Sequence, residues 1–275
     1  MKDSLGDRMK KYYEDRAKTC LPRRTYTLIR IDGKAFHSYT RGLDTPFDMG
    51  LVDSMDFAAI QTCKQIQGAK FAYVQSDEAS ILTTDFENLA SQAWFDGNVQ
   101  KIVSISASIF TAEFNKFRLM LYFDDQSSGR NISEQFDAGS DLETIKEDIA
   151  SFANYFPLDL PTAKFDSRTF TIPHPIEVQN YFIWRQKDCV RNSISAVAQS
   201  LYSHKELSGK NTNQMQEMIF QKGINWNNID DKLKRGRLIL KNKETNEWES
   251  IAPPIFTQDE GFLKNLIPIH YDTSG

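Results

Sequence analysis

The order of apolar segments in the first 125 residues constrains the fold more than any other feature of the chain. A β-branched, apolar run at residues 25–32 predicts a strand, and it stops abruptly at Asp32, which a glycine follows. Apolar positions near a period of four predict a helix at residues 49–68. The next three segments predict a β-hairpin, a packed helix and a strand, at residues 70–84, 101–117 and 118–124. The resulting order, β-α-β-β-α-β, is typical of a ferredoxin-like antiparallel sheet of the α+β class.

The second half of the chain is predicted to be mainly helical. A polar segment at residues 127–143 predicts a surface loop. Beyond it we expect a strand, a long helix with proline at its entry, a shorter helix with Asn and Thr capping candidates, and a final hairpin. These elements fall at residues 163–173, 175–203, 211–223 and 236–254. We therefore divide the chain into residues 1–135 and residues 136–275.

Length and composition exclude several classes of protein. A chain of 275 residues buries roughly three quarters of its unfolded surface, so it needs no disulfide or metal to fold. Its cysteines, 3 in number and without a CxxC pair, argue against a disulfide framework and a zinc site. The charged N-terminus is unlike a signal peptide, and no stretch approaches the ~20 apolar residues of a membrane span. We therefore expect a soluble, cytoplasmic protein. The formal charge of -4 neither indicates nor excludes nucleic-acid binding, which depends on local patches.

Three carboxylates are predicted to meet at one rim of the sheet. Asp32 ends the first strand, and Asp77 and Glu78 lie in the hairpin formed by the second and third strands. The first and third strands are central neighbours in this topology, so the three side chains are expected to converge. Two carboxylates with a backbone carbonyl suit Mg²⁺, which prefers oxygen ligands and keeps several waters. Two such ions can hold a nucleoside triphosphate for in-line attack at phosphorus.

The segment after Asp32 suits a phosphate group. Gly33 lets an anion approach the backbone, and the amides of residues 33–37 open a predicted helix whose dipole favours negative charge. Positive charge along the same segment comes from Lys34, His37 and Arg41. A plainer interpretation stays open, because Asp before Gly is a common turn, Asp32 can cap the helix, and the acidic hairpin can be only a polar turn.

Basic and aromatic residues elsewhere each have two interpretations. Lysine and arginine cluster at residues 203–210 and 231–243, where they can form a stripe that contacts a phosphate backbone. A solvated helix face and an edge strand protected by lysine give the same pattern, which we favour for the clusters alone. We interpret four aromatic residues as core rather than as a base-stacking platform: Phe71, Tyr73, Phe182 and Trp184. The sequence contains no P-loop, GxGxxG or GxSxG motif.

Several motifs, in the same order along the chain, resemble the tRNA-histidine guanylyltransferase superfamily. They are RIDGKAFHSYTRG, AYVQSDEASIL, FDSRTF, NYFIWRQKDCVRNSIS and SHKELSGKNTNQMQEMIFQKGINWN. The resemblance runs from near the N-terminus to about Asn227. It implies a catalytic core similar to the palm of ordinary polymerases at residues 1–135, with residues 136–275 forming a helical and hairpin region that packs on the palm and contacts tRNA.

The resemblance also implies an activity and a site. Members of the superfamily add nucleotides to the 5′ end of tRNA in the 3′-to-5′ direction, with two Mg²⁺ ions. A 5′-monophosphate is first activated with ATP, and the 3′-hydroxyl of an incoming GTP or other nucleoside triphosphate then attacks the activated phosphorus. The implied catalytic residues are Asp32, Asp77 and Glu78, and the implied metal ligands are Asp32, Asp77 and the carbonyl of Gly33. The implied nucleotide-binding residues are Asp32, Gly33, Lys34, Ala35, Phe36, His37, Ser76 and Asp77.

Two departures from the superfamily bear on the substrate. The members that add guanylate to tRNA-His carry His-Ile-Asn-Asn where this chain has Val190-Arg191-Asn192-Ser193, so only Asn192 is kept. The loop after the first motif is shorter, and Thr45 stands where those enzymes place a lysine before proline. Both departures favour the branch that repairs truncated tRNA 5′ ends by Watson–Crick pairing over non-templated guanylate addition.

Alternatives of other classes stay open. A palm-like core can also serve a nucleotide cyclase, and a chain that keeps the fold without the metals is an RNA-binding module. The intact carboxylates argue against that last interpretation. For tRNA contacts we single out Lys205, Lys210, Arg235 and Arg237. The resemblance further implies a homo-oligomer, often a tetramer, in which tRNA can bridge subunits.

Overall fold

A six-stranded antiparallel sheet forms the centre of the molecule. The computed structural model describes residues 4–127 and 161–269. The strands lie in the order β4-β1-β3-β2-β5-β6, and every pair of neighbours is antiparallel. Their bounds are Tyr26–Gly33 for β1, Ala69–Gln75 for β2, Glu78–Thr83 for β3, Phe165–Ile172 for β4, Arg237–Lys241 for β5 and Trp248–Ile251 for β6. The predicted first strand, the predicted hairpin and their central pairing are confirmed.

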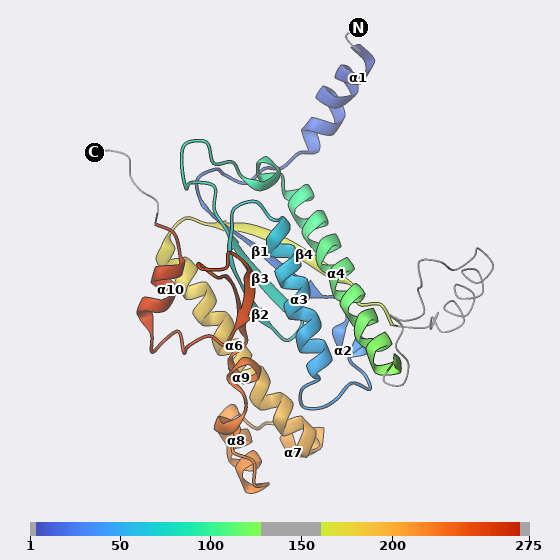
Figure 1. Cartoon of the computed structure of the whole chain (residues 1–275), viewed down its shortest axis with the longest axis vertical. Coiled ribbons are helices and arrows are strands. Elements are labelled where there is room, and N and C mark those ends of the chain that lie inside the picture. The colour runs from blue at the N-terminus through green and yellow to red at the C-terminus, as the bar shows by residue number, and fades with distance from the viewer. Residues whose placement is uncertain (1–3, 128–160, 270–275) are drawn as a thin grey trace, which may run out of the picture.

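Helices cover both faces of the sheet (Figure 1). α3 (Met49–Gln65) and α4 (Val99–Ser127) pack on one face, and α6 (Pro175–Leu201) packs on the other. Three of the aromatic residues predicted to be core, Phe71, Tyr73 and Phe182, are fully buried in the core between the sheet and α6. The fourth prediction is wrong, because Trp184 on the same helix is 51% exposed.

The alternation of side chains along β1 decides what reaches each face. Ile29 and Ile31 lie in the core beside α3 and α4, while Leu28 lies in the core beside α6. Because side chains two residues apart share a face of the sheet, Arg30 and Asp32 follow Leu28 towards α6. The end of β1 therefore brings a carboxylate to the α6 side of the sheet rim.

The prediction of a strand at residues 118–124 is wrong, because this segment is the last part of α4. No glycine or proline interrupts residues 99–127, so nothing ends the helix where its composition becomes more apolar. Phe117 stacks on Phe57 of α3, with 4.6 Å between ring centroids, and this contact anchors the helix just before the mispredicted segment. The last strand of the predicted pattern is instead β4, which pairs with β1 along its whole length.

The C-terminal elements follow the predicted order. α6 begins at the predicted proline, and α8 (Thr212–Gln221) begins with a capping box in which Asn211 and Gln214 bond reciprocally. The predicted final hairpin is β5–β6, and β5 pairs with β2, so both halves of the chain contribute strands to one sheet. The division expected between residues 135 and 136 lies outside the described residues, as does nearly all of the predicted loop at 127–143. The short helices of this half are α7 (His204–Leu207), α9 (Asp231–Arg235) and α10 (Glu260–Leu266).

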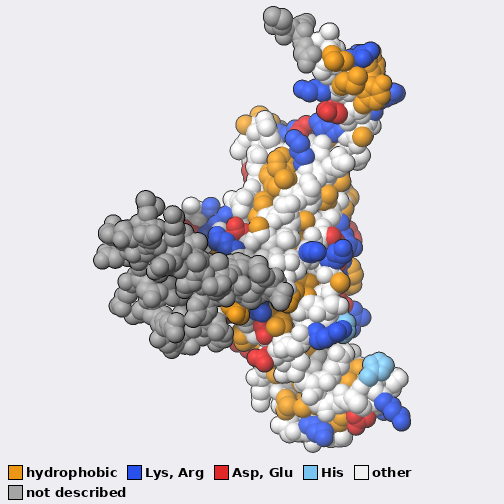
Figure 2. All heavy atoms as spheres, turned by 90° about the vertical axis from the view of Figure 1, so that its right-hand side faces the viewer, with side chains coloured by type: hydrophobic (Ala, Val, Ile, Leu, Met, Phe, Trp, Pro, Cys, Tyr) orange, Lys and Arg blue, Asp and Glu red, His pale blue; other side chains and the backbone are white. Residues whose placement is uncertain are grey.

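The N-terminal helical segment projects from the body of the molecule (Figure 1). α1 (Ser4–Met9) continues into a turn of π-helix and a turn of 3₁₀-helix that ends at Ala17, and none of these residues is buried. Its surface mixes cationic and apolar side chains (Figure 2), and its most exposed apolar residues are Leu5, Tyr12 and Tyr13. No helix within residues 4–127 or 161–269 combines the length and the apolar character that crossing a membrane requires.

A buried ion pair between α3 and the C-terminal hairpin gives a test of this packing. Arg237 Nε donates to Asp56 Oδ1 at 2.6 Å, and Ser250 Oγ donates to Asp56 Oδ2 at 2.6 Å. Asp56→Ala leaves the guanidinium, whose side chain is 4% exposed, without its counter-charge. We expect the free energy of unfolding in urea to fall by about 3–5 kcal/mol.

The matched control is Asp53→Ala, which removes an exposed carboxylate from the same helix. It should change the free energy of unfolding by less than about 1 kcal/mol. Equal losses in the two variants would show that the buried pair contributes nothing specific.

Candidate active site

The end of β1 and the turn of the β2–β3 hairpin meet at one rim of the sheet. Asp32 lies directly opposite Glu78 in the β1–β3 pairing, and the Gly33 amide donates to the Asp77 carbonyl at 3.0 Å. Ser76 and Asp77 form the two-residue turn of the hairpin. The structure thus brings together the three carboxylates that the topology predicted to converge.

Gly33 is required by the packing around it. A Cβ atom at this position would lie 2.2 Å from the Phe36 ring and 2.8 Å from Asp77 Oδ2. The Phe36 ring has little room to move, because it packs against Phe114 and Phe165 in the core. The absence of a side chain at Gly33 therefore lets the Asp77 carboxylate come close to the end of β1.

The segment after Gly33 matches the predicted anion site only in part. α2 (Phe36–Tyr39) is a single turn, and Ala35 before it has a left-handed backbone with a φ of 53°. The amides of residues 33 and 34 are already bound to backbone carbonyls, at 3.0 and 2.7 Å. The amides of residues 35–37 make no hydrogen bond to the rest of the described chain, so they are the ones left to bind an anion. The exposed cations of this segment are Lys34, His37 and Arg41.

Glu78 lies beneath the rim rather than on it. Its side chain is 6% exposed, with Arg30 Nη2 at 2.5 Å from Oε2 and Arg185 Nε at 3.1 Å from Oε1. Ser80 Oγ donates to Oε1 at 3.2 Å. Burial raises the pKa of the Glu78 carboxyl, and the two arginines oppose that rise. The carboxylate thereby joins β1, β3 and α6 at the site.

Asp32 and Asp77 are the accessible carboxylates. The Asp32 side chain is 30% exposed, and its Oδ2 lies 3.8 Å from Arg30 Nη2 and 3.6 Å from Arg168 Nη2. Burial raises the pKa of Asp77, and the nearby negative charge of Asp32 adds to the rise, while a hydrogen bond from Ser76 opposes it. A cation placed between the two carboxylates would offset their repulsion.

The donor set suits Mg²⁺ better than a metal held by protein ligands alone. Among the residues that the structure describes, no three His, Cys, Asp or Glu side chains gather closely enough to hold a metal ion. Asp32 and Asp77 supply two carboxylates beside the main chain of Gly33. Mg²⁺ is usually bound by one or two carboxylates together with waters and substrate phosphates, so this pair is enough for it.

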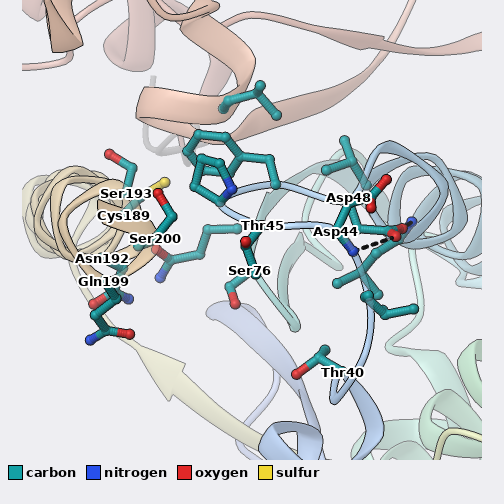
Figure 3. Close-up of a pocket in the computed structure, with 18 of the residues that line it drawn as sticks. Thr40, Asp44, Thr45, Asp48, Ser76, Cys189, Asn192, Ser193, Gln199 and Ser200 are labelled. Atoms are coloured by element: carbon teal, nitrogen blue, oxygen red, sulfur yellow. Dashed lines mark hydrogen bonds between the residues drawn. The ribbon is translucent and has the colours of Figure 1, made fainter. Parts of the chain in front are cut away.

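A pocket of about 550 Å³ adjoins the turn of the hairpin (Figure 3). Its walls are the segment of residues 43–48 and one face of α6, and Ser76 lies between them. Its size is that of a small-molecule site. Sequence reasoning missed the pocket, because residues far apart in the chain form it and no local pattern links them. Its neutral polar lining consists of Thr40, Thr45, Gln75, Ser76, Asn192, Ser193, Gln199 and Ser200.

The four cations predicted to contact tRNA lie in different environments. Lys205 and Lys210 are exposed, in and just after α7. Arg235 is partly buried, with its Nη1 2.6 Å from Asp231 Oδ1 one helical turn earlier. Arg237 is buried in its ion pair with α3 and lines the pocket rather than an open surface, so we withdraw it as a tRNA contact.

Comparison with known proteins identifies the family. The family model described as tRNAHis guanylyltransferase matches residues 6–173, which contain both accessible carboxylates and strands β1 to β4. The chain belongs to the tRNAHis guanylyltransferase family.

Solved structures and a sequence relative from the guanylyltransferase family resemble this chain over most of its length. A bacterial tRNA(His) guanylyltransferase-like protein in complex with ATP is 37% identical, with a TM-score of 0.78, over 96% of this chain and 99% of that one. A bacterial protein of the same description in complex with GTP is 35% identical, with a TM-score of 0.69 and the same coverage. A probable tRNA(His) guanylyltransferase of Dictyostelium discoideum is 27% identical over 237 residues, which are 81% of this chain and 78% of the relative. The chain is accordingly a nucleotidyltransferase of this family.

Gly33→Ala tests whether this guanylyltransferase-family site needs the close approach of Asp77. The added methyl group has to displace the Phe36 ring or the Asp77 carboxylate. A displacement of about 1 Å can lower a rate about 100-fold, so we expect nucleotidyl transfer to fall by about that factor in a protein that still folds by circular dichroism.

The matched control is Gly261→Ala, where the nearest atom to the added methyl group is 3.7 Å away. It should keep wild-type activity. Full activity in Gly33→Ala would mean that the Asp77 carboxylate does not need its present position.

Proposed function

We propose that this enzyme adds nucleotides to the 5′ end of tRNA, in the 3′-to-5′ direction and opposite a template base. The observation that carries the proposal is the pair of accessible carboxylates, Asp32 and Asp77, at a rim that adjoins a pocket of about 550 Å³. The bacterial relatives in complex with ATP and GTP support nucleoside triphosphates as ligands of this chain. Membership of the family supports tRNA as the second substrate.

Asp32, Asp77 and the Gly33 carbonyl are the proposed ligands of Mg²⁺. When bound, two Mg²⁺ ions neutralise phosphate charge and favour in-line attack at phosphorus. The chain itself keeps the two carboxylates close, because the Gly33 amide is bound to the Asp77 carbonyl and nothing at Gly33 blocks the Asp77 side chain. Arg30 and Arg168 hold Asp32 from the other side.

Glu78 has a different proposed role from the other two acids. Its oxygens are occupied by Arg30, Arg185 and Ser80, and its side chain is 6% exposed. We infer that it positions Asp32 through the shared contact with Arg30 and does not touch substrate.

The nucleoside triphosphate is proposed to lie along the segment that follows β1. Its phosphates can accept hydrogen bonds from the amides of residues 35–37 and meet the exposed cations of that segment. Ser76 connects the carboxylates to the pocket, where hydroxyl and amide side chains offer donors and acceptors to a base. In the first step ATP transfers its AMP group to the RNA 5′-phosphate and releases pyrophosphate. In the second step the 3′-hydroxyl of the incoming nucleotide attacks the activated phosphorus and displaces AMP, and both steps use the same carboxylates.

Template-dependent repair is proposed over non-templated guanylate addition. Ser193, which departs from the enzymes acting on tRNA-His, lines the pocket, and so does Thr45 from the shortened loop. Both departures therefore change the walls of the proposed nucleotide site. The relatives named tRNA(His) guanylyltransferase support a second candidate, addition of guanylate to tRNA-His.

The tRNA is proposed to approach across the exposed lysines of α7 and the loop that follows it. Lys205 and Lys210 are exposed and can meet phosphates, and the partly exposed Arg235 is the third cation in this proposal. We also propose that the enzyme is a homo-oligomer, with a tetramer as the expected state in light scattering.

The decisive assay uses Mg²⁺, ATP, the four nucleoside triphosphates and a 5′-monophosphorylated tRNA that lacks its first nucleotide. We expect extension by the nucleotide complementary to the opposite base. Asp32→Asn and Asp77→Asn each remove one charge at nearly constant size, and each should slow extension by about 100-fold or more. Asp96→Asn is the control, because this carboxylate is 72% exposed and pairs with Arg23 away from the site.

Each outcome of this assay discriminates between functions. If guanylate is added regardless of the opposite base, the result supports the second candidate. No extension with any tRNA would overturn both, and a cyclic nucleotide formed without RNA would indicate a cyclase instead.

The tRNA surface is tested with Lys205→Ala and Lys210→Ala. Each should weaken tRNA binding and reduce the slope of log Kd against log salt by roughly one, since one phosphate contact is lost. Lys116→Ala, a 61% exposed lysine of α4, should change neither quantity. Unchanged slopes in both α7-region variants would remove these lysines from the interface.

A further inference from the structure

Trp184 is exposed at a point of α6 where its neighbours are buried. Its exposed fraction is 51%, whereas Phe182 is fully buried and Arg185 is 3% exposed. A single exposed aromatic residue needs no explanation by itself. The residues around Trp184, in contrast, indicate that its ring is part of a binding surface.

The indole ring is held in a fixed orientation. The guanidinium carbon of Arg185 lies 4.1 Å from the ring centroid, and the ring of Tyr181 meets it edge-on at 5.8 Å. Arg185 is itself held by Glu78 at 3.1 Å, and the Tyr181 hydroxyl lies 2.8 Å from Ser80 Oγ in a hydrogen bond. A ring held in this way loses little conformational freedom when a flat group stacks on it.

The ring also lies on the part of α6 that approaches the active-site rim. Tyr181 contacts Phe170 of β4, and the next turn of α6 carries Trp184 towards the rim, since Arg185 reaches Glu78 there. Arg168 is two residues from Phe170 on the same face of β4, in the same direction. From the contact between Tyr181 and Phe170, Trp184 and Arg168 are therefore both displaced towards the rim, by about 5 and 7 Å along their own elements. Arg168 Nη2 in turn lies 3.6 Å from Asp32 Oδ2.

Positive charge accompanies the ring. The Arg168 side chain is 54% exposed, and besides Asp32 its Nη2 also meets Asp166 Oδ1 at 3.4 Å. Lys187 and Arg191 follow Trp184 by three and seven residues, which places them on the same exposed face of α6, and Arg191 is paired there with Asp188. An aromatic platform with cations beside it is the arrangement that holds single-stranded nucleic acid without reading its sequence.

This surface is separate from the pocket. The pocket is lined by another face of α6, with residues that recur at helical spacing, and Trp184 is not among them. The α6 residues on the pocket side are Cys189, Asn192, Ser193, Ala196, Gln199 and Ser200. One helix thus divides the neighbourhood of the carboxylates into two surfaces. One is a concave pocket whose charged lining residues are Asp44, Asp48 and Arg237, and the other is an open surface that exposes Arg168, Lys187 and Arg191.

We propose that Trp184 stacks on an unpaired base at the acceptor end of the RNA substrate, while Arg168 and Lys187 contact the neighbouring phosphates. The proposal rests on the function proposed above, because it assigns the RNA to the open surface and the nucleoside triphosphate to the pocket. Stacking accepts any base, which suits an enzyme whose template base differs from one RNA to another.

A purely structural role for Trp184 predicts a different behaviour. In that case the indole only covers the pair of Arg185 and Glu78, and any apolar side chain of similar bulk can replace it. Trp184→Leu and Trp184→Phe both keep apolar cover, but only the phenylalanine keeps an aromatic face. The two variants therefore separate stacking from covering.

The experiment uses the full chain without nucleotide and tRNAs that lack the first nucleotide. Each tRNA carries 2-aminopurine at one unpaired position of the acceptor end, whose fluorescence falls when the base stacks. We expect wild type and Trp184→Phe to quench at one position at least, and Trp184→Leu to lose that quenching. Binding of the same RNA should weaken about tenfold in Trp184→Leu, while a fully paired blunt RNA should bind all three proteins alike.

The controls keep this inference distinct from the proposed function. ATP binding and thermal unfolding are measured on each variant, so loss of folding is not mistaken for loss of stacking. Quenching that is identical in all three proteins would overturn the stacking proposal even if 5′ extension occurs. Quenching that depends on Trp184 in a protein that extends no RNA would support stacking and overturn the polymerase instead. If Trp184→Leu weakened binding of the blunt RNA and of the tRNA that lacks its first nucleotide equally, the stacking proposal would also be overturned, because a stacking site needs an unpaired base.

Discussion

The buried carboxylate of Glu78 is the contact on which the site depends. A carboxylate this far from water is unfavourable without counter-charges, and breaking such a pair typically costs about 3–5 kcal/mol. Its counter-charges come from two different elements, Arg30 of β1 and Arg185 of α6, so the sheet rim and the helix are fixed to each other at this point. Asp32 is held by the same Arg30, and the Trp184 ring lies against the same Arg185. One buried charge therefore positions an accessible carboxylate on one side and an exposed aromatic ring on the other.

The sequence carried most of the information about the sheet, because its signals are local. The β-branched, apolar run of β1, the short hairpin turn and the helix period in α3 each lie within about 20 residues, and all three elements were predicted correctly. The strand prediction for residues 118–124 was wrong for a physical reason. The apolar residues of this segment suit a strand or a buried helix equally, and only the lack of a helix-breaking residue decides between them. β4 was predicted to be a strand but was not assigned to the βαββαβ pattern, because no local pattern shows that its partner is β1.

The site was predictable where strand pairing alone determines proximity. Asp32 and Glu78 are opposite each other because β1 and β3 are neighbours, which follows from the βαββαβ order. What each residue does depends on burial, and burial depends on distant parts of the chain. Arg237 and its partner Asp56 are 181 residues apart, so the sequence shows a basic cluster where the folded protein has a neutralised pair. The same limit applies to Glu78, because the sequence does not show that Arg185 of α6 pairs with it and buries it beneath the rim.

The two faces of α6 suggest how one small site can bind two negatively charged substrates. The proposed reaction joins a nucleoside triphosphate to the end of an RNA, and their phosphates would repel each other strongly if both entered by one route. Here the pocket and the Trp184 face lie on different sides of the helix, and both adjoin the carboxylates. Each substrate can then be held by its own surface, with base contacts on opposite sides and phosphate charge meeting only at Asp32 and Asp77, where Mg²⁺ can offset it. A helix anchored by Arg185 to Glu78 keeps these two surfaces in a constant relation to the carboxylates, which in-line attack requires.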